Sequence, residues 1–131
     1  MEKFKFSVKS LNLLNNPDLN PSLRTLFMEA IKDSPLDFTI IETVRTREKQ
    51  IEYIKKGTSQ TMKSRHIPSS NASGYCEAVD IAPYPIDWND TKRFDKLAEH
   101  ILKKAKQLNI PITWGGTWKT LVDKPHFELK R

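Results

Sequence analysis

The chain has few features that could cross-link or anchor it. Its 131 residues contain one cysteine, Cys76, which excludes an internal disulfide framework and leaves packing, with or without a metal, to stabilise the fold. No stretch approaches the roughly 20 apolar residues of a membrane span. Residues 1–20 lack the apolar run and the small-residue cleavage site of a secretory signal. We therefore expect one soluble domain over residues 1–131, kept in the cytoplasm without stable membrane association.

Acidic residues are too few to balance the basic ones, because 22 Lys and Arg face 16 Asp and Glu for a net charge of +6. Such an excess favours an anionic partner, such as nucleic acid, a lipid surface or the bacterial cell wall. The lysines, however, fall on the expected helix faces without interleaved aromatic residues or a known docking motif. We therefore expect no nucleic-acid partner, and nothing in the sequence indicates more than a monomer.

Helices alternate with short strands along the chain, with no repeat and no low-complexity segment. Apolar residues at helical spacing, bounded by caps, predict helices at residues 20–34, 46–57 and 90–109. Segments rich in β-branched residues or with alternating faces predict strands at residues 36–44, 78–83, 111–114 and 125–130. In the second helix, Ile51 and Ile54 are expected to belong to an apolar stripe on the buried face. Gly115 and Gly116 mark a turn between the last two strands.

Two of the predicted strands each offer one potential metal ligand. Alternation along "AVDIAP" places Asp80 on the face opposite to Val79 and Ile81. The same alternation along "PHFEL" places His126 away from the core. With the imidazole of His66, these residues make a set of two histidines and one carboxylate. That set can hold a catalytic zinc ion and leave a fourth position open for water.

Other polar residues could complete such a site. Asp123 precedes His126 by three residues, and it could act as the base for the attacking water if the chain turns near Pro125. Glu128 lies on the same strand face as His126 and could orient its imidazole, although an exposed edge-strand role is equally open. Cys76 could be a soft zinc ligand, but a small buried thiol is the favoured interpretation.

Five short segments occur in an order that points to a known family: "VRTREKQ", "SQTMKSRH", "AVDIAPY", "WGGTW" and "DKPHFEL". Over about residues 36–130 the chain resembles phage and bacterial zinc peptidases of the D-alanyl-D-alanine carboxypeptidase and L-alanyl-D-glutamate peptidase family, and the N-terminal segment has no recognised counterpart. The resemblance implies a small α+β domain with a central antiparallel sheet that carries the zinc site and is flanked by helices. By position in these motifs, it implies zinc ligands at His66, Asp80 and His126, a catalytic base at Asp123, and an arginine for the carbonyl oxygen under attack at Arg45.

One departure from the family pattern concerns the spacing of the first two ligands. The family usually places the aspartate roughly seven residues after the first histidine, whereas His66 and Asp80 are 14 apart (80 − 66). The extra residues are mostly small and polar, which suits a surface loop whose closure entropy grows slowly with length. Cys76 and Glu77 replace residues common in the family, so local substrate contacts can differ.

Several other residues have a simpler interpretation than a role in the site. His100 is expected to be a structural residue on the flank of a polar helix. Arg47 is expected to be a solvated helix residue. Trp114 and Trp118 could line a substrate groove or pack against the core, and the sequence does not choose between these roles. Ser64 could hydrogen-bond within the site, but it lacks the flanking base that a serine nucleophile needs.

Among the branches of the family, the motifs look most like those of phage endolysins that cut the L-alanyl-D-glutamate bond of peptidoglycan stem peptides. The resemblance implies a zinc hydrolase with peptidoglycan as its partner, made in the host cytoplasm and reaching the wall through a separate membrane pore. A D-alanyl-D-alanine carboxypeptidase or dipeptidase would use the same five residues. A zinc-containing wall-binding module without catalysis is a further alternative, but Asp123 and Arg45 argue against it.

Overall fold

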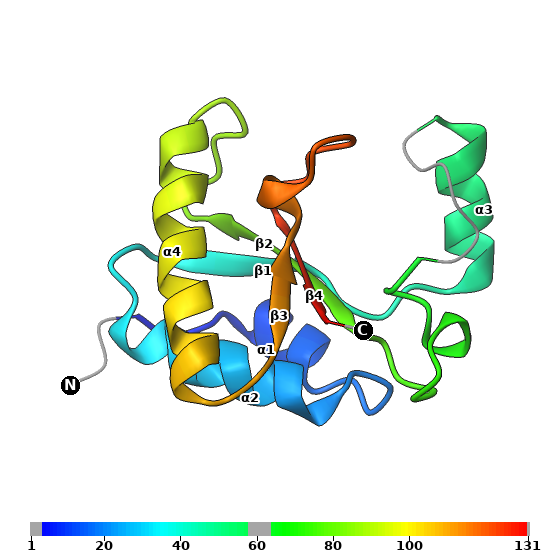
Figure 1. Ribbon diagram of the computed structural model, residues 1–131, viewed down its shortest axis with the longest axis horizontal. Helices are drawn as coiled ribbons and strands as arrows, with labels where there is room; N and C mark the ends of the chain where they lie inside the picture. Colours follow the sequence, from blue (N-terminus) through cyan, green and yellow to red (C-terminus); the bar gives the residue numbers. More distant parts are fainter. Residues whose placement is uncertain (1–3, 58–63, 131) are drawn as a thin grey trace.

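A four-stranded antiparallel sheet places the residues that the sequence singles out (Figure 1). The computed structural model describes residues 4–57 and 64–130, and the strands in it lie in the order β1-β2-β4-β3. The strands are β1 (Phe38–Glu42), β2 (Ala78–Pro83), β3 (Ile112–Trp114) and β4 (His126–Leu129). The register pairs Asp80 of β2 with His126 of β4. Two predicted metal ligands are therefore cross-strand neighbours.

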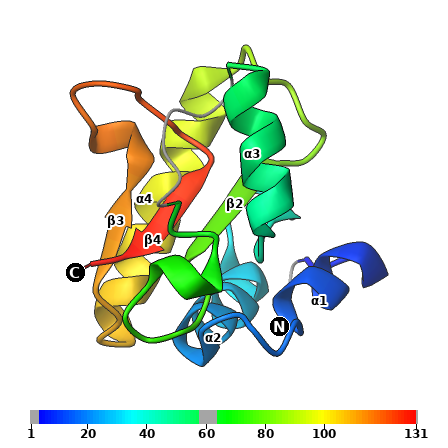
Figure 2. The same ribbon diagram turned by 90° about the vertical axis from the view of Figure 1, so that its right-hand side faces the viewer.

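Four α-helices flank this sheet in the described part of the chain. They are α1 (Val8–Leu14), α2 (Pro21–Ala30), α3 (Arg47–Lys55) and α4 (Thr91–Gln107). Helix α4 packs on α2 and contacts β2 and β3, while α1 contacts β1. Helix α3 lies on the other side of the sheet from α4 (Figures 1 and 2), and none of its residues belongs to the main apolar cluster. The α+β fold expected from the resemblance is confirmed.

The helices begin where the sequence predicts a cap. The side chains of Asn20, Thr46 and Asp90 accept hydrogen bonds from backbone N–H groups in the first turns of α2, α3 and α4, respectively. Along α4, one face of the helix is buried against the core, and its buried residues are Phe94, Leu97, Ala98, Ile101 and Ala105. None of the helices within residues 4–57 and 64–130 is long and apolar enough to cross a membrane.

The structure differs from the sequence-based expectation in two helices. The predicted apolar stripe of α3 is wrong at Ile51, which is exposed, whereas Ile54 is partly buried and the buried residue of the helix is Gln50. Helix α1 was not predicted, since its seven residues carry too short an apolar pattern, yet Ser7 caps it. Short 3₁₀ helices at Ile31–Asp33, Pro68–Ser70 and Gly115–Thr117 connect the larger elements.

Candidate active site

Three predicted metal ligands meet at one edge of the β2–β4 ladder. One ligand atom from each of His66, Asp80 and His126 lies within 4.8 Å of the other two. Oδ1 of Asp80 is 3.3 Å from Nε2 of His66 and 3.0 Å from Nδ1 of His126. Both imidazoles are buried, and the aspartate is partly accessible. Two ligands thus come from paired strands, and the third comes from the segment before β2.

Hydrogen bonds on the far side of each ring fix which nitrogen faces Asp80. Nδ1 of His66 donates to the carbonyl oxygen of Thr43 at 2.7 Å, because that oxygen can only accept. Nε2 of His126 likewise donates to Oε1 of Glu128 at 2.7 Å. In the neutral rings, the remaining nitrogens therefore direct lone pairs at the Asp80 carboxylate. Glu128 has the orienting contact that the sequence left open.

The electrostatics of the cluster favour a cation between its three side chains. Burial disfavours the ionised Asp80 carboxyl, but the neighbouring His66 and His126 outweigh burial and hold its pKa well below its usual range. Burial also disfavours the charged His126 ring, yet hydrogen bonds to Asp80 and Glu128 raise its pKa to about 9. Two lone pairs and a carboxylate converge on one point, which is stable only around a proton or a metal ion. The three residues fit a divalent metal of the kind that imidazole and carboxylate ligands select.

Asp123 lies in the loop between β3 and β4, at a sharp turn before His126. Its N–H donates to the carbonyl oxygen of Gly115 at 3.1 Å, and its own carbonyl accepts from the N–H of His126 at 3.1 Å. A Cβ added at Gly115 would lie 2.3 Å from that carbonyl oxygen, so only glycine permits this approach. Burial and the charge of Asp80 raise the pKa of the Asp123 carboxyl, a direction that suits a proton acceptor working near neutral pH.

Arg45 follows β1 and is held by several partners. Its Nε and Nη2 donate to Oε1 of Glu42, while Nη1 donates to Oε1 of Gln50 at 2.7 Å and to Oγ of Ser64 at 3.3 Å. The guanidinium also lies over the Tyr53 ring, 4.5 Å from its centroid. Contacts to described residues thus account for four of the five guanidinium N–H groups, which leaves one N–H of Nη2.

Ser64 links Arg45 to His66, one of the predicted metal ligands. Its Oγ accepts from Arg45 and from the backbone N–H of His66, at 3.2 Å for the latter. The backbone N–H of Arg45 in turn donates to the carbonyl oxygen of His66 at 3.0 Å. Ser64 therefore hydrogen-bonds beside the site, as the sequence suggested. Residues 59–63 of the quoted "SQTMKSRH" segment lie outside the described residues.

The long connection between His66 and Asp80 is held to the fold at both ends. The buried Asn71 amide donates to the carbonyl oxygens of Arg65 at 2.9 Å and Tyr75 at 2.8 Å. Cys76 forms backbone hydrogen bonds to Asp18 and Asn20 in the N-terminal segment. Residues 72–75 between these anchors are exposed. Residues 72–75 therefore form an exposed loop tip, and the predicted ligands at the two ends of the connection still meet.

The remaining candidates take the following places. Cys76 is fully buried, and burial raises its pKa to about 12, as an inert thiol requires. Nε2 of His100 donates to the carbonyl oxygen of Ala30 and pairs with Asp33, and neither partner belongs to the cluster, which agrees with a structural role. Trp114 packs on Phe127 and donates to the Lys124 carbonyl, whereas the Trp118 ring lies 5.2 Å from that of His126. Trp118 thus borders the predicted metal ligand His126.

Sequence reasoning missed two sets of residues that shape the site. Arg65 is buried and pairs with Glu77 and Glu128, although the only signal for it was its position inside "SRH". Gly115 was interpreted as a turn residue, whereas its missing side chain makes room for the Asp123 backbone. Both roles depend on contacts that form only in the folded chain, and local sequence patterns do not reveal them.

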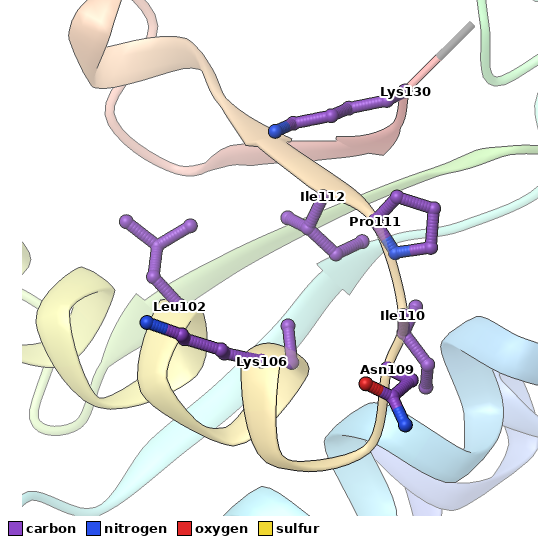
Figure 3. Close-up of a pocket in the computed structure, with 8 residues that line it drawn as sticks. Leu102, Lys106, Asn109, Ile110, Pro111, Ile112 and Lys130 are labelled. Atoms are coloured by element: carbon purple, nitrogen blue, oxygen red, sulfur yellow. The ribbon is translucent and has the colours of Figure 1, made fainter.

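A hollow of about 560 Å³ lies apart from these residues, between the C-terminal end of α4 and the start of β3. Ile112 and Leu102 contribute apolar surface to it, and Lys106 and Lys130 extend along its two sides (Figure 3). None of the predicted metal or catalytic residues lines it. The candidate site is therefore the cluster on β2 and β4, and not this hollow.

Comparison with known proteins identifies the family of the chain. A family model described as phage L-alanyl-D-glutamate peptidase matches residues 2–130. The chain belongs to this family. Because the match begins at residue 2, the expectation that the N-terminal segment has no counterpart is wrong. Residues of α1 and α2 belong to the same apolar core as the sheet, which explains why the segment is part of the family fold.

Individual members of the phage L-alanyl-D-glutamate peptidase family align over nearly the whole chain. The L-alanyl-D-glutamate peptidase of Escherichia phage T5 is 34% identical over 98% of this chain and 90% of its own length. That of Listeria phage A118 is 28% identical over 98% of this chain, which spans 43% of the A118 protein. The crystal structure of the Serratia marcescens L-Ala D-Glu endopeptidase ChiX matches with a TM-score of 0.82 and 31% identity, covering 98% of this chain and 92% of ChiX.

Proposed function

We propose that this chain is a zinc-dependent peptidoglycan peptidase that hydrolyses the L-alanyl-D-glutamate bond of the stem peptide. The observation that carries the proposal is the convergence of His66, Asp80 and His126, each with its metal-binding atom aimed at a common point. Membership of the phage L-alanyl-D-glutamate peptidase family and the likeness to ChiX support the choice of bond. The net charge of +6 suits an anionic wall polymer.

His66, Asp80 and His126 would hold the metal, and the other residues would handle protons and charge. A zinc ion there would supply Lewis-acid chemistry, which polarises the scissile carbonyl and acidifies water. Asp123 would accept the proton of the attacking water and return it to the departing amine. Its raised pKa brings the carboxyl closer to the working pH, so both transfers are feasible.

Arg45 would stabilise the negative charge that develops on the carbonyl oxygen. The contacts of its guanidinium to Glu42, Gln50 and Ser64 hold it in one orientation, so little reorganisation is needed during the reaction. With four of its N–H groups engaged, it would offer the substrate a single charged hydrogen bond instead of a bidentate fork. By the same family likeness, we propose that the protein acts on the host wall, reaching it from the cytoplasm through a separate pore.

The deciding experiment is mass spectrometry of the products from purified peptidoglycan. Fragments split between L-alanine and D-glutamate, absent after chelation and restored by zinc, are the expected result. Asp123→Ala should yield none of these fragments while still binding zinc. Released D-alanine would instead assign the chain to the D-alanyl-D-alanine carboxypeptidase branch. Binding to peptidoglycan without any product would make it a wall-binding module.

A further inference from the structure

Arg65 is a buried cation that the proposed chemistry does not use. Its side chain is only 7% exposed, and it lies between two glutamates of neighbouring chain segments. Nη2 pairs with Oε1 of Glu77 at 2.7 Å and donates to the carbonyl oxygen of Leu129 at 3.0 Å. Nη1 pairs with Oε2 of Glu128 at 3.5 Å. Burying a charged guanidinium costs desolvation free energy, so a buried arginine at this position needs a reason.

The position of Glu128 supplies that reason. One oxygen of its carboxylate faces Arg65, and the other accepts the hydrogen bond from Nε2 of His126. Nδ1 of His126 then faces Asp80, which His66 contacts from the other side. The chain of contacts therefore runs from Arg65 through Glu128, His126 and Asp80 to His66, the residue next to Arg65 in the sequence.

Two partly buried carboxylates on adjacent segments repel each other unless a cation lies between them. Ala78, the residue after Glu77, pairs with Glu128 in the β2–β4 register, and the Glu77 carbonyl accepts from the Leu129 N–H at 3.0 Å. Arg65 neutralises both carboxylates at once. Without Arg65, repulsion from Glu77 would displace Glu128 from His126. The imidazole would then lose the partner that sets its orientation and basicity.

We propose that Arg65 is a positioning residue that holds Glu128 against His126 and thereby raises the affinity of the site for its metal. The inference rests on the proposed function, because it requires that His126 bind a metal. The direction of the change in zinc affinity distinguishes a positioning role of Arg65 from a purely electrostatic effect of its charge. Removing a positive charge near a cation site should tighten zinc binding through space, whereas loss of positioning should weaken it.

The test compares zinc dissociation constants, measured by competition with a chromophoric chelator, for the wild type, Arg65→Met, Glu128→Gln and the double variant. Arg65→Met and Glu128→Gln should each raise the constant by about tenfold or more, the usual effect of losing a group that orients a metal ligand. The double variant should be no weaker than Glu128→Gln alone, because both changes act through one hydrogen bond. Arg93→Met, which removes a partly exposed arginine on α4, is the matched charge control.

A spectroscopic measurement excludes a merely structural role. In the zinc-loaded wild type, the Nε2 proton of His126 should be protected from solvent exchange and visible by NMR, and Arg65→Met should shift or lose this signal. An unchanged signal and zinc constant in Arg65→Met would overturn the proposal even if the variant is less stable. If Arg65→Met does not fold, Arg65→Lys takes its place with the same two outcomes, because a single ammonium group does not reproduce the fork of a guanidinium between two carboxylates. Failure of the wild type to bind zinc would overturn the proposed function itself.

Discussion

Two loops border the candidate site, and the structure holds them in different ways. The loop of residues 67–77 is fastened from inside, by the buried Asn71 amide and by the backbone hydrogen bonds of the buried Cys76. The loop of residues 115–125 carries Asp123 and holds it by two backbone hydrogen bonds beside Gly115. Near its tip, Leu121 and Val122 are exposed.

The difference separates two proposed tasks of the site, metal binding and proton transfer. The predicted metal ligands depend mainly on the sheet register, and the first loop that connects His66 to Asp80 is tied to the core on its own. The proposed base depends on the local conformation of the second loop. Metal affinity and turnover should therefore respond to different substitutions, and the following predictions test that separation from the largest expected effect to the smallest.

Asp80→Ala should abolish both tasks at once. Asp80 contacts both histidines, so its loss removes one ligand and the group toward which the two rings are oriented. We expect no measurable zinc binding by isothermal titration calorimetry and no clearing of peptidoglycan suspensions. Glu99→Ala, which removes an exposed carboxylate on α4, should leave both unchanged. Residual zinc-dependent hydrolysis in Asp80→Ala would show that the metal lies elsewhere.

Asp123→Asn should reduce turnover without reducing zinc affinity. The amide keeps the size of the side chain but cannot accept the proton, so turnover should fall about 10²–10⁴-fold. The zinc dissociation constant should stay within about twofold of the wild type, because no ligand is altered. Steady-state rates on a defined stem peptide, measured beside the zinc titration, check both. A variant that loses zinc together with activity would contradict the base assignment.

Much of this arrangement could be predicted from the sequence, because it follows from local patterns. Strand alternation gave the orientation of Asp80 and His126, and caps with helical spacing located α2 and α4. The resemblance added Arg45 and the pairing of distant motifs. The catalytic and ligand roles of these residues stay predictions, although the structure places the three ligands together.

The parts that could not be predicted depend on tertiary contacts that hydrophobic periodicity and turn composition do not reveal. The burial of Gln50 in place of Ile51 follows from its hydrogen bond to Arg45, which outweighs the weak apolar pattern of α3. The ion pairs of Arg65 with Glu77 and Glu128 could be predicted only if the β2–β4 register were known. The need for glycine at position 115 is visible only from the neighbouring Asp123 carbonyl.

Gly115→Ala should move the second loop without touching a ligand. The added methyl would overlap the Asp123 carbonyl, so the backbone must shift and carry the base with it. Because small misplacements of a catalytic group reduce rates strongly, we expect kcat to fall about tenfold to a hundredfold, with little change in the zinc constant.

Gly74→Ala is the matched control from the first loop. Its φ of +76° strains an alanine, but no atom lies within 4 Å of the added methyl. It should cost about 1 kcal/mol of stability and leave kcat near the wild-type value. Equal losses of kcat in the two glycine variants would contradict the distinction between the loops.

Asn71→Ala should have the smallest effect on catalysis and a clear effect on stability. The truncation leaves the carbonyl oxygens of Arg65 and Tyr75 without their buried donor, which should lower the free energy of unfolding by about 1–3 kcal/mol. The ligands are also held from other directions, His66 through Thr43 and Asp80 through the sheet. Turnover per folded molecule should therefore stay within about threefold of the wild type, since the site and the loop are separately supported. Urea unfolding and active-site-normalised rates measure the two quantities. A loss of zinc affinity beyond about tenfold would mean that the first loop, and not the sheet, sets the ligand geometry.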